Sequence, residues 1–132
     1  MIQAAILTIS DSSHQGLRAD QSGPALREVV EKLGWQVTCT EVIPDDRYQI
    51  AQRLRELADS EAAMVIFTTG GTGVAPRDVT PEALGDVIDR EIPGLGEQMR
   101  AEGLRYTPLA VLSRSLGGTR GKTLIVALPG SP

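Results

Sequence analysis

The stretch "AAMVIFTTGGTGVAPRDVTPEAL", residues 62–84, combines a strand pattern, a glycine-rich segment and a helix start. Its first eight residues, 62–69, are mostly apolar or β-branched, which is typical of a buried strand. Three glycines follow within the next four residues, and Thr80-Pro81-Glu82 then has the order of an N-cap residue, a first-turn proline and an early acid. The stretch therefore predicts a β-strand, a tight loop and an α-helix in succession.

The same alternation of strand and helix extends to both sides of this stretch. Apolar, strand-like runs alternate with segments whose apolar residues recur at helical spacing, which is typical of an α/β sandwich with a mostly parallel sheet. We therefore expect five strands and four helices. Besides those in 62–84, the strands cover 4–10, 36–43, 109–114 and 123–128, and the helices cover 24–33, 50–58 and 94–104.

Length and composition fit one globular unit. The 132 residues are enough for one domain with a core and too few for two ordinary ones, so 1–132 is interpreted as a single domain. Hydrophobic residues make up 41% and charged residues 23%, which is the usual globular balance. The closing "PGSP" resembles a strand-to-helix turn without its helix, so one interpretation is that a C-terminal helix is missing from the domain.

Charge and apolar run length exclude broad classes of partner. A net charge of −4 argues against a general nucleic-acid surface but allows a local basic pocket for one anionic ligand. The longest apolar runs are strand-sized and too short to span a membrane. The first residues lack the basic leader and cleavage site of a secretory signal, so we expect a cytoplasmic location. Cys39 is the single cysteine, which excludes an internal disulfide.

Ligands of parallel α/β sheets bind beyond the carboxyl ends of the strands, and here those ends lead into loops at 10–23, 44–47, 69–80 and 129–132. The loop at 69–80 lacks the third glycine of the dinucleotide fingerprint, because Pro76 occupies that position. "GGTRGKT" lacks the leading glycine of a phosphate-binding P-loop and precedes a strand. What remains is a backbone nest, in which Gly70, Gly71 and Gly73 turn N–H groups toward an anion.

Polar side chains beside these glycines extend the prediction to a metal. Thr69 and Thr72 add hydroxyl donors to the glycine-rich loop. Asp78 is a hard oxygen ligand of the kind that holds Mg²⁺ together with substrate phosphates, and Asp45 follows another strand of the predicted sheet. The residues therefore predict metal-assisted phosphate chemistry.

Purely structural interpretations of the same residues stay open at this point. The glycines can serve a tight connection only, Asp78 can form an Asx turn ahead of Thr80, and Asp45 can favour the next helix. Ser10-Asp11 can be turn or capping residues. His14 is most simply interpreted as a loop residue. Arg114, Arg120 and Lys122 are most simply interpreted as solvated charges.

Six segments of the chain together resemble one family. They are "ILTISD" (6–11), "VIPDD" (42–46), "TTGGTGVAPRDVTPEA" (68–83), "REIPGLGEQMR" (90–100), "LSRSLGGTRGKTLI" (112–125) and "LPGSP" (128–132). In this order they resemble the MogA/MoaB family of molybdenum cofactor biosynthesis, which includes the G domain of gephyrin. The resemblance runs essentially from end to end, and the block from GGTG to RDVTPEA is far more specific than a lone glycine pattern.

The resemblance implies a three-layer α/β/α fold, usually a homotrimer, and molybdopterin adenylyltransferase activity. That reaction converts ATP and molybdopterin to adenylylated molybdopterin and pyrophosphate with Mg²⁺, and the pathway implies a separate, MoeA-like molybdenum-inserting partner. Asp45 and Asp78 match the two important aspartates of the family and are assigned to Mg²⁺ binding and catalysis. The remaining matches are assigned to phosphate, pterin or nucleotide binding: Ser10, Asp11, Thr69, Gly70, Gly71, Thr72, Gly73, Ser113, Gly130 and Ser131.

The chain also departs from the family pattern. Active adenylyltransferases often carry Asn where this sequence has Ala127, which predicts the loss of one polar contact to ligand. Members also commonly continue beyond the closing motif, and some MoaB-type paralogues keep the fold without the activity. A catalytically inactive pterin- or nucleotide-binding paralogue and a trimeric interaction module therefore remain as alternative functions.

Overall fold

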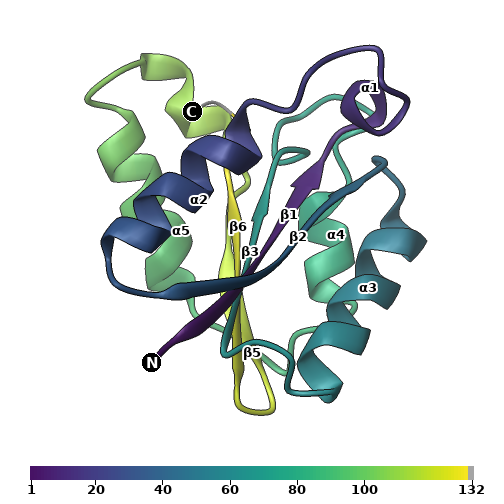
Figure 1. The fold of residues 1–132 in the computed structure, drawn as a ribbon. Coiled ribbons are helices and arrows are strands. Elements are labelled where there is room, and N and C mark those ends of the chain that lie inside the picture. Colours follow the sequence, from purple (N-terminus) through teal and green to yellow (C-terminus); the bar gives the residue numbers. More distant parts are fainter. Residues whose placement is uncertain (131–132) are drawn as a thin grey trace.

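The computed structural model describes residues 1–130, which form a six-stranded sheet with helices on both faces (Figure 1). The helices α2 and α5 cover one face, and α3 and α4 cover the other. The strands are β1 (Gln3–Ile9), β2 (Gln36–Ile43), β3 (Val65–Thr69), β4 (Arg90–Glu91), β5 (Gly117–Arg120) and β6 (Thr123–Leu128). The helices are α1 (Asp11–His14), α2 (Ser22–Lys32), α3 (Arg47–Asp59), α4 (Thr80–Gly85), α5 (Pro93–Gly103) and the 3-10 helix η1 (Pro108–Leu112).

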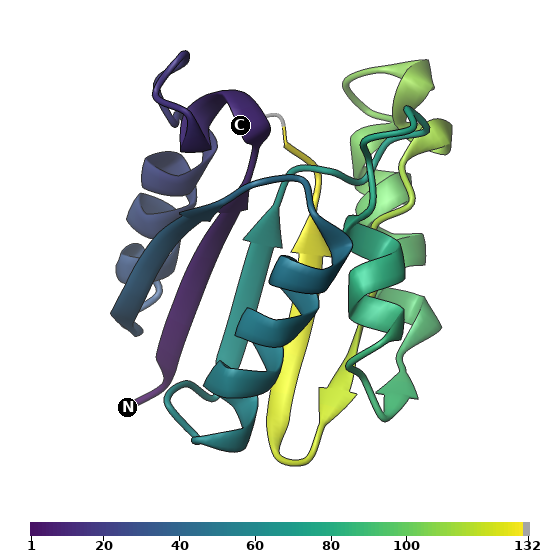
Figure 2. The same cartoon turned by 90° about the vertical axis from the view of Figure 1, so that its right-hand side faces the viewer.

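The sheet has the order β2-β1-β3-β6-β5-β4 and is mostly parallel, as predicted. The four strands β2, β1, β3 and β6 pair in parallel, whereas β5 is antiparallel to β6 and β4 is antiparallel to β5. Figure 2 shows β3 and β6 side by side with their arrowheads at the same edge. The loops that follow the parallel strands therefore meet at one edge, as the sequence predicted for a ligand site.

The two faces of the sheet bury separate apolar clusters. Ile66 of β3 packs in the larger cluster with residues of α3 and α4, whereas its neighbour Phe67 packs against the smaller cluster beneath α2. Phe67 stacks with Trp35, with ring centroids 6.3 Å apart. This alternation, with a period of two residues, is what a strand buried on both faces requires.

The predicted strand at 109–114 is wrong. Residues 108–112 form the 3-10 helix η1, and its apolar side chains Leu109, Val111 and Leu112 are exposed. Thr107 caps η1 by accepting a hydrogen bond from Leu109 N–H. An apolar run suggested a strand, but none of the strands within residues 1–130 pairs with it.

The strand beside β6 in the sheet is β5, which begins with two glycines. Gly118 lies so close to the carbonyl of Arg90 that a Cβ would clash with it. Strand propensity is low for glycine, so β5 could not be expected from composition. Gly121, at φ +56°, then closes the hairpin from β5 to β6.

Two smaller predictions also need correction. The segment 10–23, expected to be a loop, contains α1, and α2 already begins at Ser22. Thr80 is the first residue of α4 and not its N-cap, which is Val79 without a side-chain hydrogen bond. Within residues 1–130, no helix combines the length and the apolar character needed to cross a membrane.

Candidate active site

The glycine-rich loop begins where β3 ends. Gly70 N–H donates to the carbonyl of Leu128 in β6 at 3.2 Å, so this amide is used within the fold and does not face a ligand. Gly70 and Gly71 have φ of +104° and +70°, which side chains rarely adopt. A Cβ at Gly70 would clash with the carbonyl of Ile9, and one at Gly71 would clash with the Thr80 hydroxyl. These two positions therefore require glycine.

Thr80 holds the first two carbonyls of the loop. Its hydroxyl donates to Gly70 O at 2.9 Å, and its backbone N–H donates to Gly71 O at 3.2 Å. The Thr80 side chain is completely buried. The residue predicted to cap α4 therefore organises the glycine-rich loop instead.

Arg114 holds the next two carbonyls. Its backbone N–H donates to Thr72 O at 2.8 Å, and its Nε donates to Gly73 O at 2.8 Å. Arg114 was interpreted as solvated charge from the sequence, and that interpretation is wrong. Its partners lie about forty residues earlier in the chain, and no local pattern connects them.

The anchored carbonyls determine where the amides point. A trans peptide is planar, so the N–H of a residue points opposite to the C=O of the residue before it, and the chain has no cis peptide bond. With the carbonyls of 70–73 bound to Thr80 and Arg114, the N–H groups of 71–74 point away from both. Within residues 1–130, none of these N–H groups donates to a protein acceptor. The arrangement is an array of oriented, free amides.

Asp45 and Asp11 align each other beside this array. Asp11 N–H donates to Asp45 Oδ2, and Asp45 N–H donates to Asp11 Oδ1, both at 2.9 Å. The second oxygen of Asp11 accepts from Nε and Nη2 of Arg77 at 2.9 and 2.5 Å. Asp45 Oδ1, in contrast, has no hydrogen bond within the described residues and lies 3.1 Å from where a Cβ on Gly71 would be.

Asp78 flanks the other end of the loop. Its Oδ2 accepts from Ala75 N–H at 3.0 Å and lies 2.8 Å from where a Cβ on Gly73 would be. The Asx turn toward Thr80 is not formed, since Thr80 N–H donates to Gly71 O. Asp78 and Asp45 therefore flank the loop at Gly73 and Gly71.

Electrostatics distinguish Asp45 from Asp11. Burial raises the pKa of Asp45, and the negative charges of Asp11 and Asp78 raise it further, against the opposing effects of Asp11 N–H and Arg77. The pKa of Asp11 is lowered, chiefly by the hydrogen bonds from Arg77. Asp11 is thus compensated by a cation, whereas Asp45 has negative neighbours and one free oxygen.

Asp45 and Asp78 each have one carboxylate oxygen without a hydrogen bond among the described residues, and the number and type of these ligands determine which metal ion the site suits. Residues 1–130 contain no group of three or more His, Cys, Asp or Glu side chains suited to a metal ion. Two carboxylates without further protein ligands suit Mg²⁺, which keeps several waters and takes the rest of its ligands from substrate phosphates. The donor set fits that ion.

A hollow of about 650 Å³ opens beside the array. The loop and Asp78 form its polar side, and α5, η1 and the turn after β6 form the opposite wall. Ser113 and Gly130, which the family resemblance assigned to a ligand cleft, line this hollow. Arg100, which sequence reasoning did not select, also lines it and donates from Nη1 to the carbonyls of Ser113 and Ser115 at 3.3 and 3.0 Å.

A second hollow of about 200 Å³ lies at Gly70 and Gly130 and is also lined by Ser10 and Thr69. Both of these predicted residues have internal partners: Ser10 Oγ accepts from Ser13 N–H as the N-cap of α1, and the Thr69 hydroxyl donates to Pro129 O at 2.9 Å. The capping interpretation of Ser10 is therefore confirmed. Ser131 lies outside the described residues.

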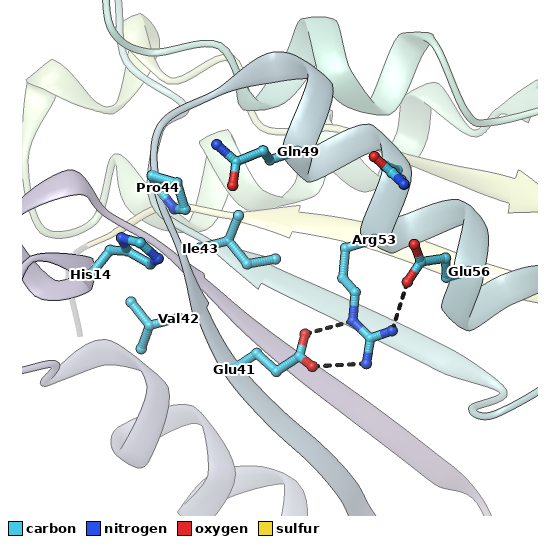
Figure 3. A pocket seen from close by; sticks show the side chains of 9 residues that line it. His14, Glu41, Val42, Ile43, Pro44, Gln49, Arg53 and Glu56 are labelled. Atoms are coloured by element: carbon cyan, nitrogen blue, oxygen red, sulfur yellow. Dashed lines mark hydrogen bonds and ion pairs between the residues drawn. The ribbon is translucent and has the colours of Figure 1, made fainter.

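A third hollow of about 290 Å³ lies between β2 and α3, and neither the residues of the amide array nor Asp45 or Asp78 line it. Figure 3 shows Arg53 at its side, with the guanidinium directed at Glu41 and Glu56. His14, in α1 and not in a loop, lies at the end of this hollow near Pro44. It is exposed and is not among the residues around the amide array.

Residues 5–132 match the family described as a probable molybdopterin binding domain. The chain belongs to the MogA/MoaB family of these domains. The family resemblance stated from the sequence is therefore confirmed, and the two aspartates and the glycine-rich loop lie within the matched residues.

Relatives in this family cover the whole chain. A molybdopterin adenylyltransferase of Haemophilus influenzae is 42% identical over 100% of this chain and 68% of that protein. One of Escherichia coli K12 is 42% identical over 99% of this chain and 68% of that protein. The solved structure of the molybdopterin biosynthesis enzyme MoaB from Thermus thermophilus is 50% identical, with a TM-score of 0.93 over 100% of this chain and 83% of that one. The MoaB structure shares the predicted α/β/α fold.

Proposed function

We propose that the protein is a molybdopterin adenylyltransferase, which transfers AMP from ATP to the phosphate of molybdopterin and releases pyrophosphate. The observation that carries the proposal is the array of four free N–H groups at 71–74, flanked by the carboxylates of Asp45 and Asp78. Relatives of 41–42% identity that carry the same activity in their names support it.

The array suits the charge problem of this reaction. A phosphate oxygen of molybdopterin attacks the α-phosphorus of ATP, the bond from that phosphorus to the bridging oxygen breaks, and the β- and γ-phosphates leave as pyrophosphate. Both reactants are polyanions, so oriented donors that neutralise them contribute most of the catalysis. The amides of 71–74 would supply such donors without any side-chain motion.

Mg²⁺ is proposed as the ion at this site. Asp45 Oδ1 and Asp78 would hold it together with substrate phosphate oxygens and water. When bound, the ion would supply positive charge to the phosphates. The reciprocal bonds to Asp11 would keep the Asp45 carboxylate aligned, so Asp11 is assigned to positioning Asp45.

The other predicted site residues divide by their contacts. Thr72, Gly71 and Gly73 would bind phosphate through their amides, whereas Gly70 forms the turn that precedes them. The larger hollow, with its apolar wall, would accept the pterin. The cleft roles of Ser10, Thr69, Ser113, Gly130 and Ser131 stay proposals.

A binding-only paralogue is the second candidate. Ala127 is completely buried in the larger core cluster and pairs with Thr68 in the β3–β6 register, so no polar side chain extends from this position. Another candidate is an interaction module, which the exposed apolar side chains of Tyr106, Leu109 and Val111 favour. A homotrimer, a cytoplasmic location, a MoeA-like partner and the extent of the domain over 1–132 also stay proposals.

The deciding experiment measures pyrophosphate release from ATP in the presence of molybdopterin, with and without Mg²⁺. The adenylyltransferase predicts release that requires both molybdopterin and Mg²⁺. Binding of pterin or ATP without release would establish the binding-only paralogue. If neither ligand binds to the folded protein, the interaction module is the correct interpretation. Asp78→Asn should reduce release sharply, with Asp59→Asn, a carboxylate remote from the loop and bound to Arg120, as the control.

A further inference from the structure

Arg114 contacts the glycine-rich loop at three backbone carbonyls, those of Thr72, Gly73 and Asp78. We infer that Arg114 is a positioning residue of the transfer site, which orients the amides of Gly73 and Val74 and fixes the backbone that carries the Asp78 carboxylate. The inference deepens the proposed function and rests on it for its effect on turnover.

The Arg114 guanidinium binds two carbonyls of the loop that lie five residues apart in the chain, those of Gly73 and Asp78. Its Nε binds Gly73 O at 2.8 Å, and its Nη2 binds Asp78 O at 2.7 Å. A planar guanidinium presents its donors in a rigid fork, so it sets the separation of these two carbonyls. An ammonium group is a single point charge and cannot hold both in the same geometry. The distance between the amide array and Asp78 therefore depends on Arg114.

Glu82 holds the guanidinium from the other side. Arg114 Nη1 donates to Glu82 Oε2 at 2.6 Å, and Nη2 donates to Oε1 at 3.2 Å. These hydrogen bonds lower the pKa of Glu82, so its carboxylate stays ionised at neutral pH. Glu82 lies in the first turn of α4, two residues after Thr80. That turn therefore anchors 70–73 twice, directly through Thr80 and indirectly through Glu82 and Arg114.

The directions of these bonds distinguish positioning from substrate binding. All the guanidinium contacts go to two loop carbonyls and to Glu82. The charge is therefore compensated within the protein, and the contact with substrate falls to the amides that Arg114 orients. About a third of each side chain in the pair is exposed, 37% for Arg114 and 36% for Glu82. Such partly exposed ion pairs contribute little to overall stability, so replacing Arg114 should change turnover more than the free energy of unfolding.

The test compares Arg114→Met and Arg114→Lys with a matched ion pair. Arg53 and Glu41 have similar exposure, 33% and 34%, and also form a bidentate pair, but away from the loop. We expect Arg114→Met to lower kcat about 100-fold, similar to the loss of one preorganised donor to a developing oxyanion. KM for molybdopterin should change less than about threefold, because the pterin rests on the apolar wall. Arg114→Lys should recover only part of kcat, and Arg53→Met should leave kcat within about twofold of the original.

Glu82→Gln tests whether the anchor acts through Arg114. It should lower kcat in the original background and have no further effect in the Arg114→Met background, since coupled residues are not additive. Full additivity of the two changes would overturn the role of Glu82. An Arg114→Met variant whose kcat equals that of Arg53→Met, or full recovery by Arg114→Lys, would overturn the role of Arg114.

Hydrogen exchange separates this inference from the proposed function. Arg114→Met should speed exchange at the Val74 amide more than about tenfold relative to Arg53→Met, because the Gly73–Val74 peptide plane loses its anchor, whereas the bond from Arg114 N–H to Thr72 O is kept. It should also weaken binding of inorganic pyrophosphate with Mg²⁺. If the original protein releases no pyrophosphate and exchange still rises, the adenylyltransferase is refuted and the positioning of the amides stands. Unchanged exchange refutes the positioning, whatever the activity.

Discussion

Asp11 and Asp45 exchange hydrogen bonds, with each carboxylate accepting from the other residue's backbone N–H at 2.9 Å. The exchange joins the end of β2 to the start of α1, and it leaves Asp45 Oδ1 free beside Gly71. Arg77 neutralises Asp11 from the opposite loop. The two carboxylates therefore differ in their surroundings. The charge of Asp11 is paired with Arg77, whereas Asp45 keeps one oxygen free to bind a cation.

Asp45→Asn should abolish most turnover and stabilise the fold. An amide oxygen can still accept from Asp11 N–H but loses the anionic ligand, so we expect kcat to fall at least about 100-fold. Because the pKa of Asp45 is raised in the folded protein, its ionisation disfavours folding as pH rises through that pKa. The variant should therefore melt on the order of 2 °C higher at neutral pH. Asp46→Asn, which keeps an N-cap side chain on α3, is the control for both measurements.

The raised pKa of Asp45 also predicts the acid limb of activity. Turnover needs ionised Asp45, so kcat/KM, which reports the pKa values of the free enzyme, should fall as pH decreases through a pKa above the ordinary aspartate value of 3.8. A limb at or below that value would contradict the assignment of Asp45. The measurement is a pH profile of pyrophosphate release at substrate concentrations well below KM.

Arg77→Gln should move this acid limb to higher pH. The change leaves the charge of Asp11 uncompensated beside Asp45 and removes the direct attraction of Arg77, and both effects raise the pKa of Asp45. Arg77 is well exposed, at 70%, so salt should reduce the shift. Arg105→Gln, which removes an arginine of 72% exposure paired with Glu102, is the matched control. Identical profiles for the two variants at low salt would rule out the proposed coupling.

Thr80→Val and Thr80→Ser test the first loop anchor, the hydroxyl that binds Gly70 O. Valine keeps the shape but removes the hydroxyl that binds Gly70 O, which should cost about 1–3 kcal/mol of stability for an unsatisfied carbonyl. Exchange at the Gly71 amide should rise and kcat should fall, since that amide lies in the same peptide plane. Serine, which keeps the hydroxyl, should recover most of the stability and most of kcat. Equal behaviour of the two variants would mean that the hydroxyl does not orient the loop.

Thr68→Val should stabilise the protein without touching the site. The Thr68 hydroxyl is completely buried in β3 and has no partner among residues 1–130. Replacing an unsatisfied polar group with a methyl removes its desolvation penalty, so we expect a gain of about 1 kcal/mol in the free energy of unfolding. Thr8→Val is the control, because the buried Thr8 hydroxyl donates to Asp20 at 2.9 Å and its loss should be destabilising. Denaturant unfolding curves of the two variants give the comparison.

Local pattern predicted the elements whose propensity and burial agree. The apolar run of β3 and the helical spacing of α3 were both found, because each buries an apolar face against the other. The local pattern predicted a strand at 109–114 that does not form, and it missed the strand at 117–120. In the first segment the apolar side chains remain exposed, and in the second the pairing with β6 outweighs the low strand propensity of glycine.

By itself the sequence determined the alternation of strands and helices and the family, and it located Asp45 and Asp78 in the loops after two strands that are consecutive in the chain. These follow from periodicity, from residue type and from the rule that parallel strands end at one edge. Only the tertiary structure decided which amides are free. The direction of each N–H depends on the partner of the preceding carbonyl, and those partners, Thr80 and Arg114, lie 10 and 41 residues further along the chain. No local pattern contains a hydrogen bond over that separation.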